Sequence, residues 1–250
     1  MRRTGSVAFL VLCCSLLLIS PTLRDASAQK LAAANSSANA NPFSTLELEV
    51  VSEINLARTR PAEYAAFLEG LRSQFTGKEY RRPGKPALMT AEGAPALEEA
   101  IRFLRAARPV PAVTLSRGMC AGARALVEEQ SVSGATGHRG ADGGFCEQRT
   151  KIFGTWVDPI GENLNYSDDT ARERVMTLLI DDGVANRGHR QRIFNSSYKV
   201  VGVACGSHKI GGMCAITFAA GFTDKAAPAR PQATKKNANA PVTPSGVKRF

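Results

Sequence analysis

Residues 198–222 read YKVVGVACGSHKIGGMCAITFAAGF, and this stretch decides the fold class. Its two apolar halves are rich in β-branched and aromatic residues, and a glycine-rich segment between them has a cysteine near each end. The pattern predicts a β-hairpin with strands over 198–205 and 213–222. Cys205 and Cys214 then lie where a bond between the two strands would join them.

Helical patterns precede the hairpin. Ser44 and Glu47 match an S-x-x-E capping box, and apolar residues follow at helical spacing. Segments 74–90 and 132–146 hold Pro and Gly and are expected to be loops. Helices followed by strands indicate an α+β layered domain. The other expected helices cover 61–71, 92–108, 117–131 and a segment that starts at the capping box of Thr170 and Glu173.

The two ends of the chain differ in composition from its centre. Residues 1–28 resemble a secretory signal, with a basic start, an apolar run too short to span a bilayer and an A-x-A cleavage site. A linker at 29–42 and a tail at 225–250 flank a domain at 43–224. No segment after the signal approaches membrane-spanning length. We therefore expect a protein that is secreted or held in the periplasm or cell envelope.

The net charge of +10 is concentrated in the tail. This tail has no acidic residue, so its charge reflects a solvated extension and not a basic binding domain. The sequence therefore gives no support for a nucleic-acid partner. The basic residues of the tail are Lys225, Arg230, Lys235, Lys236, Lys248 and Arg249.

The cysteines that remain after signal cleavage are Cys120, Cys146, Cys205 and Cys214. An even number in an exported protein indicates two disulfides, for which three connectivities exist. We expect the bond across the hairpin, from Cys205 to Cys214, which leaves Cys120 to pair with Cys146. The alternative for the remaining cysteines is a pair of unlinked, buried thiols.

Three short polar steps, each led by glycine, lie upstream of the hairpin at 137–139, 161–163 and 188–190. Glycine permits tight turns and close backbone approach, so each step can aim the next side chain into a cleft. We expect one composite site built from three loops. Its members are His138, Glu162 and His189.

Three roles are open for this set of residues. Two imidazoles and a carboxylate are the ligands of many catalytic zinc sites. They could equally form a metal-free acid–base group or a polar network that fixes the loops. Within a metal-assisted hydrolase Glu162 would be the general base, but no nucleophile stands out and no catalytic residue is firm.

A second acid is inferred from helical periodicity. If the helix after Thr170 continues, Asp182 extends the apolar stripe of Val175 and Leu178 toward the core, whereas Asp181 points elsewhere. The alternative is that Asp181 and Asp182 merely end the helix at the surface. His208 is expected to be an exposed turn residue. Arg139 and Arg190 are expected either to bind an anion or, more commonly, to form surface ion pairs.

These motifs together resemble the CAP superfamily, which comprises cysteine-rich secretory proteins, antigen 5 and pathogenesis-related 1 proteins, and is also called the SCP domain. The similarity is to its bacterial branch and covers about residues 46–222. The strings that carry it lie at 53–64, 137–138, 161–164, 179–184, 188–190, 193–195, 200–205 and 213–214.

The resemblance implies a three-layer α-β-α sandwich with a central groove that carries two His and two acids. In this chain the groove residues would be His138, Glu162, Asp182 and His189, although the second acid departs from the glutamate of animal and plant members. The implied function is non-catalytic binding of an unidentified ligand, with a lipid or an envelope polymer as candidates. Zn²⁺ is the first candidate for a divalent ion in the groove, and metal-assisted hydrolysis is the alternative function.

Overall fold

A computed structural model describes residues 41–225 of the chain. The signal at 1–28, most of the linker at 29–42 and most of the tail at 225–250 lie outside the described residues. The chain divides into two units, of which the second, Thr45–Phe250, contains the fold. Within residues 41–225, no helix combines the length and the apolar character needed to cross a bilayer.

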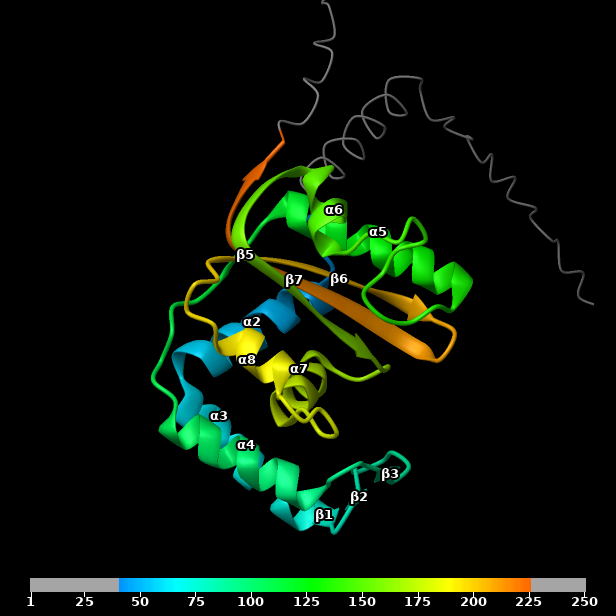
Figure 1. The fold of residues 1–250 in the computed structure, drawn as a ribbon. Helices are drawn as coiled ribbons and strands as arrows, with labels where there is room; N and C mark the ends of the chain where they lie inside the picture. The colour runs from blue at the N-terminus through cyan, green and yellow to red at the C-terminus, as the bar shows by residue number, and fades with distance from the viewer. Residues whose placement is uncertain (1–40, 226–250) are drawn as a thin grey trace, which may run out of the picture. The chain divides into compact units, whose positions relative to one another are not determined.

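A four-stranded sheet in the order β4-β6-β7-β5 forms the middle layer (Figure 1). The hairpin is confirmed, but its strands extend further than expected, and β6 still pairs with β7 at His208 and Gly211. The turn is therefore tight, and Cys205 lies opposite Cys214. The strands are β4 (Thr114–Leu115), β5 (Gly154–Tyr166), β6 (Val200–His208) and β7 (Gly211–Asp224).

Helices α5 (Arg117–Ser133) and α6 (Cys146–Lys151) cover one face of the sheet (Figure 1). The side chain of Ser116 caps α5 by accepting a hydrogen bond from the Met119 amide, and Gly134 ends the helix with φ 73°. Helix α5 lies close to β6 because Gly202 of the strand has no side chain. A Cβ on Gly202 would come within 2.2 Å of the Met119 backbone. Leu126 and Val127 belong to the small core of this face.

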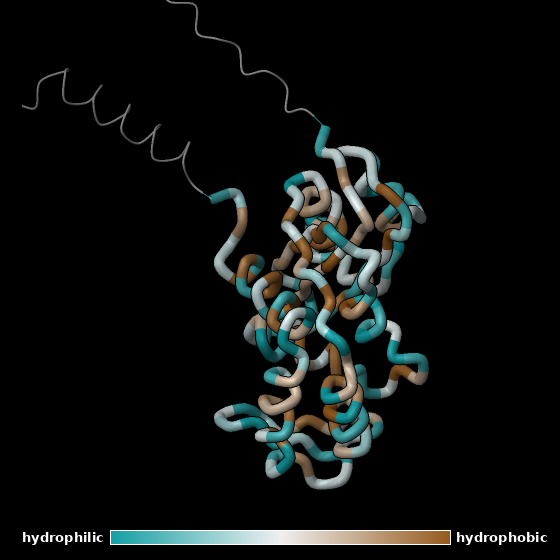
Figure 2. The backbone as a smooth tube through the Cα atoms, turned by 90° about the vertical axis from the view of Figure 1, so that its left-hand side faces the viewer, coloured by the Kyte–Doolittle hydropathy of each residue, from teal (hydrophilic) through white to brown (hydrophobic). Residues whose placement is uncertain are grey.

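The other face is covered by α2 (Thr45–Thr59), α7 (Ala171–Ile180) and α8 (Gly188–Phe194). The expected capping box at Thr170 is present at the start of α7. The larger core lies between these helices and the sheet and includes fully buried Ile54. In Figure 2 hydrophobic and hydrophilic positions alternate along the helices and strands, as expected for elements with one buried face. Cores on both faces of one sheet confirm the three-layer α-β-α sandwich of an α+β fold.

The outermost helices, α3 (Pro61–Glu69) and α4 (Ala94–Ala106), pack against each other and onto α2 and α7. Between them the segment expected to be a loop forms a small antiparallel sheet. Its strands have two residues each, too few for a hydrophobic period to show in the sequence. They are β1 (Phe75–Thr76), β2 (Glu79–Tyr80) and β3 (Leu88–Met89).

The strand β5 corrects the expectation that Gly161 and Glu162 lie in a loop. The segment lacks a regular apolar alternation, and Asp158-Pro159 falls where the register with β7 shifts between Val157 and Ile160. Tertiary pairing with the apolar β7 makes it a strand. The site at 161–163 therefore lies on a rigid element.

Candidate functional site

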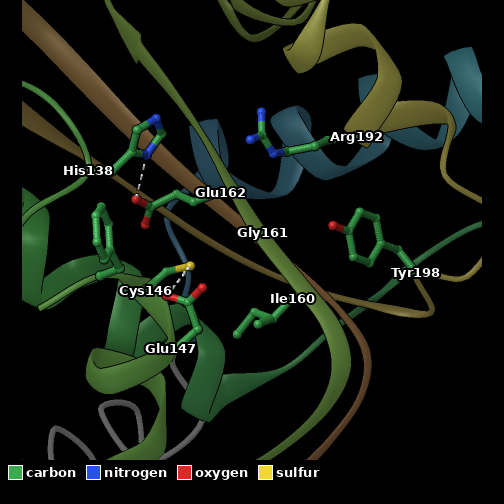
Figure 3. A pocket seen from close by; sticks show the side chains of 9 residues that line it. His138, Cys146, Glu147, Ile160, Gly161, Glu162, Arg192 and Tyr198 are labelled. Carbon is green, nitrogen blue, oxygen red and sulfur yellow. Dashed lines mark hydrogen bonds and ion pairs between the residues drawn. The ribbon is translucent and has the colours of Figure 1, made fainter.

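His138 and Glu162 form a close pair, with 3.0 Å between Nδ1 and Oε1 (Figure 3). The imidazole lies in the loop between α5 and α6, and 40% of its side chain is exposed, against 2% for Glu162. The loop is fixed beside it, because Gln130 donates to the Gly137 carbonyl and Tyr166 accepts from the Gly137 amide. The structure brings these two predicted site residues together.

Glu162 is held on all sides. Arg149 donates to its Oε2 over 2.6 Å, and the Thr217 hydroxyl donates to the same oxygen over 3.3 Å. Arg149 also donates to the His138 carbonyl over 2.9 Å, so one guanidinium fixes both members of the pair. Because both oxygens of this buried carboxylate have hydrogen-bond partners, it is fixed in place. Its role in the structure is to orient His138.

A cavity of about 370 Å³ lies beside this pair, and we call it the edge pocket. Residues 160–162 of β5 run through it, with His138 and Glu147 on one side and Arg192 and Tyr198 on the other (Figure 3). A Cβ at Gly161 would come within 2.8 Å of the Tyr198 hydroxyl and 3.2 Å of Arg192 Nε. Glycine at position 161 therefore lets Tyr198 and Arg192 pack close against β5.

His189 forms a second pair with an acid, and the acid is Asp181. The distance between His189 Nδ1 and Asp181 Oδ1 is 2.6 Å, and Asp181 Oδ2 accepts from the His189 amide over 2.9 Å. Asp181 ends α7 in the left-handed conformation with φ 56°, which turns its carboxylate toward the start of α8. His189 lies within α8 and not in a loop.

The choice of Asp182 was wrong. Its carboxylate accepts from the amides of Ala91, Glu92 and Gly93 over 2.6 to 2.9 Å and joins α7 to the start of α4. Because α7 ends at Ile180, the apolar stripe of the helix does not extend to position 182.

The predicted set of four does not form one ligand cluster. His138 and Glu162 line the edge pocket, whereas His189 belongs to the separate pair on α8. Asn163 connects the two regions through a 3.0 Å hydrogen bond from its Nδ2 to the His189 carbonyl. Across residues 41–225, no three His, Cys, Asp or Glu side chains are grouped so that they could hold a metal ion. The residues present therefore do not fit a zinc site of the usual three or four protein ligands.

The Cys205–Cys214 disulfide is confirmed. The expected bond between Cys120 and Cys146 was wrong, because both are free and buried. The Cys120 thiol faces the sheet and accepts from the Val203 amide over 3.2 Å. Helix α5 meets α6 at Gly122 and not at Cys120. A Cβ on Gly122 would come within 2.7 Å of Thr150 of α6.

The free thiols are poor nucleophiles. Burial raises the pKa of Cys120 to about 11. Burial, with the carboxylates of Glu162 and Glu147 nearby, raises the pKa of Cys146 well above its ordinary value. Cys146 lines the edge pocket, but the thiol and not the reactive thiolate is present there near neutral pH.

The arginines singled out in the sequence do not serve the pocket. Arg190 is buried, pairs with Glu99 and donates to two carbonyls at the end of α7. Arg139 stacks over the Phe145 ring at 4.2 Å. The pocket's cation is Arg192, which sequence reasoning missed although it follows the third glycine step by a few residues.

His208 was also placed wrongly. It is buried rather than exposed, and its Nε2 lies 2.9 Å from the Ala135 carbonyl oxygen. Because the hairpin ladder continues to its end, His208 is a strand residue facing Tyr166, with ring centroids 5.2 Å apart.

Comparison with known proteins gives one family. Residues 98–218 match the CAP family, described as the cysteine-rich secretory protein family. No curated protein matches the sequence. Among solved structures, an extracellular protein containing a SCP domain from Bacillus anthracis str. Ames is similar, with 16% identity and a TM-score of 0.34. That match covers 44% of this chain and 34% of the other.

The family match spans the helices and strands from α4 to β7. It also includes the two histidine–carboxylate pairs and every residue of the edge pocket described above. Residues 98–218 of the chain therefore form a region of the cysteine-rich secretory protein (CAP) family.

Proposed function

We propose that this protein is a non-catalytic binding module that acts outside the cytoplasm, in the cell envelope or beyond it. The edge pocket is its binding site. A disulfide between adjacent strands suits an oxidising compartment, which supports export.

One observation carries this proposal. The Arg192 guanidinium lines the pocket without an ion pair or hydrogen bond to another described residue, and the Tyr198 hydroxyl lies beside it across Gly161. A guanidinium keeps its charge and presents several donors in a fixed plane. The pocket is therefore suited to hold an anionic group, and its volume is in the range of ligand sites.

Two features of the same pocket favour binding over catalysis. Glu162 is bound by Arg149, Thr217 and His138, so it is not free to take a proton from water. The Cys146 thiol has a raised pKa. The alternative function, a metal-assisted hydrolase, would need more metal ligands than the imidazoles of His138 and His189. No observation favours this alternative.

Acetate is a suitable first probe, because it carries only the carboxylate that Arg192 would bind. We expect acetate to shift the NMR signals of the Gly161 amide and of Arg192 Nε in a saturable titration. Arg192→Gln should abolish the shifts, and Arg108→Gln, at an exposed position outside the pocket, should leave them unchanged. Absence of any saturable shift in the wild-type protein would refute the proposal.

Turnover is the second test. Panels of peptide, ester and glycan substrates should show none, with or without added Zn²⁺. Calorimetric titration with Zn²⁺, beside the His138→Ala/His189→Ala double variant, tests the ion that the sequence suggested. Hydrolysis that disappears in Glu162→Gln would replace the binding function with the enzymatic one.

A further inference from the structure

The strand that runs through the edge pocket is an edge strand. β5 has 13 residues, and within the described part of the chain it pairs with β7 alone, so its outer edge has no neighbouring strand there. Among the described residues, no side chain and no other segment donates to or accepts from the main chain of residues 160–162 on that edge. Unpaired N–H and C=O groups on a long edge strand are a template for another strand.

The pocket extends around this edge to both faces of the sheet. Gly161 is opposite Phe218 and Glu162 is opposite Thr217, and successive residues of a strand face opposite sides. The Gly161 side holds Tyr198, which stacks on Phe218. The Glu162 side holds His138 (Figure 3). A pocket lined from both sides can exist only where the strand edge itself is open.

The two walls carry opposite charges that lack partners. Arg192 lies on one wall, and within residues 41–225 it makes no ion pair. Glu147 lies on the other wall, and among the described residues its carboxylate has only a 3.6 Å contact from the Cys146 thiol and no cation. A strand laid along the edge would point alternate side chains at these two walls.

We propose that the ligand of the edge pocket is an extended peptide that adds as a strand to the outer edge of β5 at residues 160–162. An acidic side chain of the peptide binds Arg192 and the Tyr198 hydroxyl. The next side chain along is basic and binds Glu147. This inference rests on the proposed binding function and specifies its ligand class.

In strand addition, the main chain and the side chains of the peptide have different roles. The main-chain hydrogen bonds provide affinity for any sequence, and the two walls provide specificity. Gly161 matters in this geometry because a side chain there would push away the Tyr198 hydroxyl and Arg192, the two groups that bind the acidic side chain. No metal and no covalent step is needed.

The probe is a blocked hexapeptide, acetyl-Thr-Val-Glu-Lys-Val-Thr-amide, titrated into the purified protein and followed by amide NMR. We expect shifts at residues 160–162 and binding that weakens about tenfold or more in Arg192→Gln, since a hydrogen bond to a charged group is lost. Arg108→Gln is the matched control. The Arg192→Glu variant should bind the peptide in which Lys replaces Glu more tightly than the original hexapeptide. Binding with exchanged charge would also show that the variant is folded.

Main-chain pairing has its own test. Two further peptides carry N-methyl groups on one or the other set of alternate nitrogens, because alternate N–H groups point to opposite edges of a strand. One peptide should lose binding and the other should retain it. Equal behaviour of the two, whether both bind or neither binds, would overturn the proposal.

Acetate distinguishes a failure of the peptide inference from a failure of the proposed binding function. If acetate still binds at Arg192 while the hexapeptide binds no better than acetate, the peptide inference is wrong and the binding function stands. If neither probe binds, both are wrong.

Discussion

At the scale of single residues, one fully buried arginine positions the wall of the edge pocket. Arg58 of α2 donates to the carbonyls of Ile193 and Asn195 at the end of α8 and of Tyr198 before β6. Its Nε donates to the Pro111 carbonyl over 2.8 Å. Burial lowers the pKa of Arg58. Four main-chain acceptors from distant segments thus depend on one side chain.

Arg58→Met should therefore be severely destabilising. Methionine fills part of the volume but leaves these carbonyls without donors, so we expect a loss of at least about 3 kcal/mol in the free energy of unfolding. Urea denaturation followed by circular dichroism measures it. Arg108→Met, at an exposed position, should change stability by less than about 0.5 kcal/mol. Equal stability of the two variants would contradict the role given to Arg58.

Adjacent aspartates have different roles, and a pair of matched variants distinguishes them. Asp181→Asn should change the ring ¹⁵N shifts of His189, because the carboxylate that binds Nδ1 is lost. Asp182→Asn should leave those shifts unchanged but lower the melting temperature, because three amides at the start of α4 lose a charged acceptor. A change at His189 in Asp182→Asn alone would reverse the assignment.

At the scale of elements, Arg187 joins the α7–α8 connection to α4. It pairs with Glu92 and Glu99 and donates to the Asp181 carbonyl. The hydrogen bonds from Arg187 hold the pKa of Glu92 down, from 4.5 to about 2. They also lower the pKa of Glu99.

These lowered pKa values predict an acid-dependent contribution to stability. A carboxyl whose pKa falls on folding stabilises the protein above its unfolded pKa, and this contribution is lost as pH falls through the folded pKa. Arg187→Gln should lower the melting temperature at pH 6, and the difference from wild type should shrink between pH 4.5 and about 2. Scanning calorimetry across that range measures it. A difference that stays constant to pH 2 would contradict the assignment.

At the same scale, a disulfide stabilises the hairpin of β6 and β7. Cys205 and Cys214 are 9 positions apart in the sequence, and the bond between them restricts the unfolded chain. The loop-entropy relation gives about 2 to 3 kcal/mol for a loop of this size. The Cys205→Ser/Cys214→Ser double variant should lose about that amount of stability. Unfolding of the double variant would show that the hairpin depends on the disulfide more than its ladder of main-chain hydrogen bonds suggests.

At the scale of the whole molecule, the free thiols report on cooperative unfolding. Cys120 lies between α5 and the sheet, and Cys146 lies between α6 and β5, so both are covered by the outer helical layer. Their raised pKa values further slow reaction with alkylating agents. In the native protein iodoacetamide should label neither, and in denaturant it should label both, as intact mass shows. Rapid native labelling of Cys146 through the edge pocket would reveal local opening of α6.

Much of this molecule follows from local sequence. Capping at Thr170, helical periodicity and the apolar β-rich halves around Cys205 and Cys214 predicted the helices and the hairpin, because each is set by residues close in the chain. The glycine steps predicted that His138 meets Glu162. The layered α+β class followed from the order of these elements.

Other features were decided by contacts between distant segments. β5 is a strand because β7 pairs with it, despite its irregular pattern. The choice of Asp181 over Asp182 depended on where α7 ends, and a single left-handed residue set that. Arg192 and Tyr198 became pocket residues because Arg58 holds their segment beside Gly161. Local pattern determines the helices and the hairpin, whereas long-range packing determines that β5 is a strand and which side chains meet. The edge pocket depends on this long-range packing.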